Sequence, residues 1–234
     1  MPAAHPRLWF TPQSDRLDSA RQWYSHARPG LGELRVDEPA SSTAALNHCF
    51  DYLMRGNDAA ENADRAIEWL MNFELRELES AISNDYARWH MESAILIYDW
   101  CHDRMREAQR QDRIDYFNHA LRLLFKKNWG HDPMPANNYF QGYLRNAIEW
   151  VIATHDENPA AEELCVKYVG HRLGNVLLPY YNHGGGRGGT PAEGGQYGVY
   201  MIDYSLIPYA TLRDYLPGKA DVFERTNFFA ENFY

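Results

Sequence analysis

Apolar residues recur at the spacing of an amphipathic helix along nearly the whole chain, and almost no stretch alternates as a half-buried strand would. The clearest example lies between residues 58 and 78, where the apolar positions are Ala63, Ala66, Ile67, Leu70, Phe73 and Leu78. Such a pattern buries one face of each helix against its neighbours. The sequence therefore predicts an all-α fold.

Capping and turn residues divide this pattern into separate helices. The break at residues 131–135 is firm, because Pro133 and Pro135 have no backbone donor and a fixed φ. Short loops predict antiparallel neighbours, and the lack of a 34-residue repeat argues against a regular solenoid. The expected helices span 14–27, 41–54, 58–78, 85–101, 110–127, 137–154, 159–178 and 191–212, with a turn at 217–218 before a short last helix.

Length and charge limit the possible partners. The 234 residues suffice for one large domain with a real core, or for part of a larger protein. A net charge of −9 argues against a nucleic-acid partner, whose binding needs a basic surface. The chain has no apolar run long enough to span a membrane, and residues 1–6 lack the pattern of a signal peptide.

The residues that commonly bind metals are scattered. Three widely spaced cysteines, Cys49, Cys101 and Cys165, are expected to be buried free thiols. His90 with Glu92, and Cys101 with His102, have no further ligand at helical spacing. The sequence therefore predicts neither a metal site nor a cofactor.

A glycine-rich loop at residues 184–189 leads directly into a helix. Five of its six residues are glycine, which permits positive φ and the close approach of a ligand. The loop formally matches G-x-G-x-x-G, but no strand precedes it and no lysine follows Gly189, so nucleotide binding is disfavoured. Behind the loop, one helix face is expected to present Glu193, Tyr197, Tyr200 and Tyr204, as part of a site or as an aromatic core stripe.

A second candidate site opens the helix after the proline-rich break. Asn137 is a good N-cap residue, and Asn138 falls in the first turn beside backbone N–H groups that have no helical partner. That position favours an anion such as a carboxylate. The alternative is a purely structural helix cap.

Four segments in this order resemble one family over nearly the whole chain. They are residues 5–11 (HPRLWFT), 94–100 (AILIYDW), 137–139 (NNY) and 188–197, with Glu193 and Tyr197 in the last. Together they are similar to the N-terminal helical domain of the heparinase II/III-like polysaccharide lyases. The resemblance implies that residues 1–234 form an incomplete (α/α) toroid of antiparallel helix pairs, truncated before a C-terminal β-sandwich domain, in a periplasmic or secreted protein.

The resemblance also implies an activity, that of a carbon–oxygen lyase that cleaves a uronate-containing polysaccharide by β-elimination. Asn138 would neutralise the uronate carboxylate, with Asn137 as the near alternative, and Tyr197 would be the acid and sometimes the base. Arg187 or Arg145 would supply a positive field for the phenol. Sugar contacts are expected from Gln141 and Glu193, and stacking surfaces from Tyr139, Tyr143 and Trp89. The family takes a further histidine and tyrosine from its sandwich domain, which this chain does not contain.

Two other functions remain open. A glycoside hydrolase on the same scaffold would need a pair of carboxylates across a cleft. The candidates for such a pair are Asp85, Asp99, Asp132 and Glu193. A non-catalytic domain would bind the polysaccharide without cleaving it. The acidic chain favours alginate or a similar uronate polymer over highly sulfated heparin.

Overall fold

The computed structural model describes residues 4–12, 14–215 and 221–232. Every regular element in these ranges is helical and none is a strand, which confirms the all-α expectation. None of the described helices combines the length and the apolar character needed to cross a membrane. The turn expected at 217–218 lies outside the described residues.

Thirteen labelled α-helices and five short helical turns follow one another in the described residues. The α-helices are α1 (Asp15–His26), α2 (Ser42–Arg55), α3 (Ala60–Asn72), α4 (Asp85–Trp89), α5 (Met91–Trp100), α6 (Glu107–Leu124), α7 (Asn138–Thr154), α8 (Ala161–Leu164), α9 (Leu178–His183), α10 (Gly194–Tyr197), α11 (Val199–Tyr215), α12 (Val222–Arg225) and α13 (Phe228–Asn232). The 3-10 turns are η1 (Pro39–Ser41), η2 (Gly56–Ala59) and η3 (His102–Arg104), and the π-helical turns are η4 (Cys165–Gly170) and η5 (Arg172–Leu177).

Several boundaries follow the local capping chemistry that the sequence shows. Ser14 caps α1 by accepting a hydrogen bond from the Leu17 N–H, and Asn137 caps α7 by accepting one from the Tyr139 N–H. Gly56 ends α2 with a φ of 60°, a conformation that glycine adopts without a steric penalty. These three ends were expected from the sequence.

Two expected helices are shorter or divided. The helix expected over 58–78 ends at Asn72, because Phe73 turns to an extended conformation and is buried. The helix expected over 85–101 breaks at His90, whose Nδ1 lies 2.8 Å from Ser42 Oγ at the start of α2. In both places tertiary packing overrides a continuous helical pattern.

Two others differ near the glycine-rich loop. The helix expected over 159–178 runs on to His183, through η4, η5 and α9. The segment expected as one helix over 191–212 begins as a turn and then forms α10 and α11. Glu193 is therefore the N-cap residue of α10 rather than a residue within the helix.

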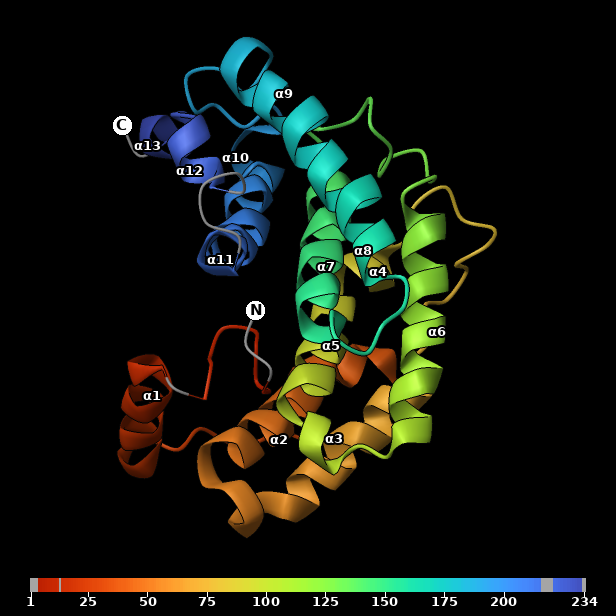
Figure 1. Ribbon diagram of the computed structural model, residues 1–234, viewed down its shortest axis with the longest axis vertical. Helices are drawn as coiled ribbons and strands as arrows, with labels where there is room; N and C mark the ends of the chain where they lie inside the picture. Colours follow the sequence, from red (N-terminus) through yellow and green to blue (C-terminus); the bar gives the residue numbers. More distant parts are fainter. Residues whose placement is uncertain (1–3, 13, 216–220, 233–234) are drawn as a thin grey trace.

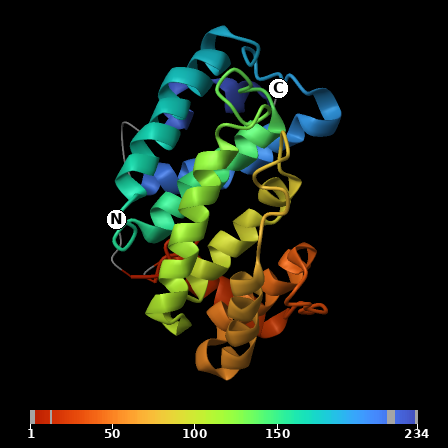
Figure 2. The same ribbon diagram turned by 90° about the vertical axis from the view of Figure 1, so that its right-hand side faces the viewer.

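The helix α7 is the centre of the molecule, and all 17 of its residues are buried. It packs against α4, α5, α6 and α11 and also against η4 (Figure 1). Figure 2 shows α6 lying across the outer side of α7. A helix buried on every side needs a hydrogen-bond partner inside the protein for each of its polar side chains. The helix α7 carries several such side chains.

Candidate functional site

Two of the four segments on which the family resemblance depends meet at the start of α7. The backbone N–H and the side-chain amide of Asn138 donate hydrogen bonds to Glu193 Oε2, at 3.0 and 2.9 Å. The residues are 55 positions apart in the chain. The first turn of α7 thus binds a carboxylate, as its free N–H groups favour, and the carboxylate is the protein's own.

Arg88 contacts the oxygen of the Asn138 side-chain amide. Its Nη1 donates to Asn138 Oδ1, and its Nη2 forms an ion pair with Asp85 Oδ1 at 2.7 Å. The guanidinium lies over the rings of Trp89 and Tyr139, with 4.3 and 4.2 Å between its central carbon and their centroids. Arg88 was missed by sequence reasoning, although its place three residues after Asp85 on a helix is a signal for an ion pair.

Aromatic rings form a row beside this polar cluster. Tyr200 stacks on Tyr204 with 5.2 Å between centroids, and it contacts Tyr197 at 6.1 Å and Trp89 edge-on at 5.3 Å. The expected single helix face is divided: Tyr200 and Tyr204 share a face of α11, Tyr197 contacts Tyr200 from α10, and Glu193 precedes α10. Trp89 and Tyr197 are 42% and 43% exposed, so the row presents aromatic surface to solvent.

Arg145 lies deeper than expected and next to a different tyrosine. It forms an ion pair with Glu92 at 2.9 Å, donates to the Arg88 carbonyl, and lies 4.4 Å from the centroid of Tyr204. The Tyr204 hydroxyl is buried and has no hydrogen-bond partner among the described residues. Burial raises the pKa of Tyr204 to about 12, an effect that the positive charges of Arg145 and Arg88 partly oppose.

Some expected site residues are core residues instead. The Gln141 amide donates to the Pro135 carbonyl, and the residue is only 1% exposed. The fully buried Tyr143 accepts a hydrogen bond from the Asn84 N–H at 2.7 Å. Because α7 is buried on all sides, neither side chain reaches the surface of the molecule.

The remaining candidates are accounted for by local structure. Asn137 is the cap of α7, and the buried Tyr139 donates from its hydroxyl to Asp85 Oδ1 at 2.7 Å. Arg187 is exposed on the glycine-rich loop, and its guanidinium forms no hydrogen bond or ion pair with the described residues.

The glycine-rich loop packs against the chain itself. A Cβ on Gly189 would lie 2.3 Å from the backbone nitrogen of Asn232 in α13, and the Asn232 amide donates to the Gly189 carbonyl. A Cβ on Gly186 would meet the ring of Tyr180 at 2.9 Å. Packing within the chain therefore explains why residues 186 and 189 are glycine, and no ligand is needed to explain them. A cavity of about 540 Å³ adjoins the loop, lined by α10 and α11 residues that include Gly194 and Ile202.

Two carboxylates considered for hydrolysis are held elsewhere. Asp99 accepts hydrogen bonds from the backbone of Arg7 and Leu8, both at 2.8 Å. Asp132 pairs with His171 at 2.7 Å. Neither has a described contact with Glu193.

Comparisons with known proteins found no match. No protein-family model, curated protein or solved structure matches the chain. The likeness to the heparinase II/III-like lyases therefore depends on the four sequence segments alone.

Proposed function

We propose that this chain is the helical part of a polysaccharide lyase that acts on a uronate-containing polymer, with its helices forming part of an (α/α) toroid. The observation that carries the proposal is the pair of hydrogen bonds from Asn138 to Glu193. They join residues 137–139 to residues 188–197, two of the four segments in which the sequence resembles the family.

The carboxylate-binding geometry suits the first requirement of β-elimination. The uronate carboxylate must be neutralised before the C5 proton becomes acidic. Asn138 offers two N–H donors that already accommodate the Glu193 carboxylate, and the Arg88 guanidinium lies behind the amide. In the proposed mechanism the substrate carboxylate replaces that of Glu193, which then contacts sugar hydroxyls. Gly194, with a φ of 67°, follows Glu193 and gives the backbone a turn that other residues rarely adopt.

Proton transfer is assigned to Tyr197. Its side chain is nearly half exposed, one turn after Glu193, in an aromatic row that also offers Trp89 for stacking on a sugar ring. Tyr197 would act first as the base and then as the acid: its deprotonated oxygen takes the C5 proton, the C–H electron pair forms the C4–C5 double bond as the C4–O4 bond breaks, and the same proton passes to the leaving O4. The family's second histidine and tyrosine would come from a sandwich domain.

The test is the ultraviolet absorbance of the unsaturated uronate product. The chain is incubated separately with alginate, heparan sulfate, heparin and chondroitin. We expect a rise with alginate that Tyr197→Phe and Asn138→Ala abolish. Tyr168→Phe is the control, because Tyr168 stacks on Phe125 outside this cluster. New reducing ends without the absorbance would instead indicate hydrolysis, in which Glu193→Gln is the inactivating change.

A non-catalytic carbohydrate-binding domain is the second candidate, favoured by the exposed aromatic row. Calorimetric titration with saturated uronate oligosaccharides separates the two functions. Binding that Trp89→Ala weakens, with no product from any polymer, would support the binding domain and refute catalysis by this chain. Absence of both binding and product would refute both candidates.

A further inference from the structure

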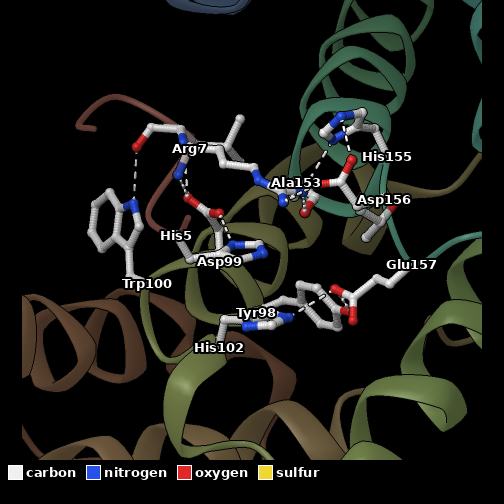
Figure 3. Close-up of polar contacts among 12 residues, drawn as sticks. His5, Arg7, Tyr98, Asp99, Trp100, His102, Ala153, His155, Asp156 and Glu157 are labelled. Carbon is white, nitrogen blue, oxygen red and sulfur yellow. Dashed lines mark hydrogen bonds and ion pairs between the residues drawn. The ribbon is translucent and has the colours of Figure 1, made fainter. Parts of the chain in front are cut away.

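Three potential metal ligands from distant parts of the chain converge on one place away from the Asn138–Glu193 cluster. They are His5 in the N-terminal segment, His102 in η3 after α5, and Glu157 in the loop between α7 and α8 (Figure 3). One ligand atom from each lies within 4.8 Å of the other two, and all three residues are partly buried. The imidazole rings stack almost parallel, with centroids 3.7 Å apart.

The hydrogen bonds around these residues orient them as ligands. His5 Nδ1 lies 2.6 Å from Asp99 Oδ1, which leaves Nε2 of the same ring for another partner. Asp99 is itself fixed by the backbone N–H groups of Arg7 and Leu8. A histidine whose second nitrogen contacts a carboxylate is the usual outer-sphere arrangement of a metal-binding imidazole.

Glu157 is oriented in the same way. Its Oε1 lies 2.8 Å from His102 Nε2 and accepts a hydrogen bond of 2.8 Å from the Tyr98 hydroxyl. Its Oε2 lies 3.3 Å from Arg110 Nε. The carboxylate is therefore held in one orientation, with Oε1 directed toward the imidazole of His102.

We propose that His5, His102 and Glu157 bind one divalent transition-metal ion, with Zn²⁺ the ion that suits the donors best. The two imidazole nitrogens are borderline donors that favour zinc over calcium or magnesium, and zinc also accepts a carboxylate oxygen beside two imidazoles. Three protein ligands leave one tetrahedral position for water.

The site would also connect the fold. Its ligands join the N-terminal segment to the end of α5 and to the loop after α7, segments that Arg7 also links through hydrogen bonds to the Ala153 carbonyl and to Asp156. An ion that binds only this arrangement stabilises the folded chain by mass action. Sequence reasoning predicted no metal site because it looked for ligands at helical spacing, and these ligands come from three separate segments.

The test uses the full chain, stripped of metal and free of any histidine tag. Co²⁺ is titrated while its visible absorption bands are recorded, and Zn²⁺ is then added as a competitor. We expect saturation at one Co²⁺ per chain, displacement by Zn²⁺, and a higher thermal unfolding midpoint with Zn²⁺. Metal binding is measured without lyase activity, so the result tests the metal site independently of the proposed function.

Single-ligand variants locate the site. His5→Gln, His102→Gln and Glu157→Gln should each weaken Co²⁺ binding at least about tenfold. His119→Gln is the matched control, since His119 also pairs with a glutamate, Glu79 at 3.1 Å, but belongs to no group of three ligands among the described residues. Circular dichroism establishes that each variant is folded, and His5→Gln, outside every helix, is the least disruptive.

Two results would overturn the proposal. One is the absence of saturable Co²⁺ binding by the wild-type chain. The other is equal binding by the wild-type chain and by His5→Gln, which would mean that any bound ion lies elsewhere.

Discussion

A single buried carboxylate, Asp51 on α2, ties together three helices near the N-terminus. Its Oδ1 accepts a hydrogen bond of 2.6 Å from Tyr24 on α1, and its Oδ2 one of 2.8 Å from Asn62 on α3. Arg28 and Arg55 pair with it at 2.9 and 3.0 Å. Burial alone would raise the pKa of Asp51, but these donors and charges outweigh it and lower the pKa below its ordinary value.

Asp51→Asn should destabilise the protein at neutral pH by about 2–4 kcal/mol, because two arginines lose their shared partner. A lowered pKa means that the folded state binds fewer protons, so this stability is present above the unfolded pKa of about 4 and is lost as the pH falls through the folded value. Urea unfolding at pH 7 and pH 3 measures both effects, and the gap between variant and wild type should shrink at pH 3.

The control for this experiment is Asp18→Asn. Asp18 is exposed and its nearest ion pair, with Arg21, spans 3.9 Å, so we expect a change below about 0.5 kcal/mol. An Asp51→Asn penalty that is the same at both pH values would show that the charge of Asp51 contributes nothing.

At the scale of elements, the glycine-rich loop and α13 depend on each other. Gly188 and Gly189 both have positive φ, at 81° and 72°. Only Gly189 touches α13, where its missing side chain lets the backbone of Asn232 approach. Glu193 and α10 follow this loop directly, so its packing also sets the position of the carboxylate bound by Asn138.

Gly189→Ala should therefore cost more stability than Gly188→Ala. Both substitutions place an L residue at positive φ, at about 1–2 kcal/mol, and only Gly189→Ala adds a steric clash worth about 1–3 kcal/mol more. Thermal unfolding of the two variants side by side measures the difference. Equal midpoints would contradict the contact between the loop and α13.

At the scale of the whole molecule, two cysteines report on the integrity of the core. Cys49 on α2 and Cys101 at the end of α5 are fully buried, with their sulfur atoms 3.0 Å apart. Burial raises the pKa of the Cys49 thiol well above its usual value. Cys165 is partly exposed, although burial raises the pKa of its thiol too.

The native chain should therefore react with iodoacetamide at Cys165 first, and at Cys49 and Cys101 only when α2 separates from α5. Mass spectrometry of the alkylated chain should show one modified thiol before unfolding and three after it. Cys165→Ser should remove the native reaction. Modification of two or three thiols at the native rate would contradict the buried positions.

Local features of the sequence predicted much of the secondary structure. Ser14, Gly56 and Asn137 mark helix ends because caps act through neighbouring backbone groups. The stacking of Tyr200 on Tyr204, four residues apart on α11, follows from the 3.6-residue period alone. The helix breaks at Phe73 and His90 were not predicted, because they are caused by contacts with other helices.

The candidate site was predicted only in part. Asn138 was expected beside free N–H groups that favour a carboxylate, and its N–H groups bind that of Glu193, while its role toward a substrate stays a prediction. The sequence did not predict that Glu193 supplies this carboxylate or that Arg88 donates to the Asn138 amide oxygen. Both contacts depend on the packing of α4, α7 and the loop before α10. No spacing rule relates residues 55 positions apart.

The sequence by itself determined the helical character of this protein, helix ends such as those at Ser14, Gly56 and Asn137, and the alignment of Tyr200 with Tyr204, because each depends on interactions within a few residues. The tertiary structure decided which polar groups meet: Glu193 with Asn138, and His5 with His102 and Glu157. It also decided which expected sugar contacts, such as Gln141, belong to the core. Burial and long-range hydrogen bonds arise only when helices pack, and a one-dimensional pattern does not specify that packing.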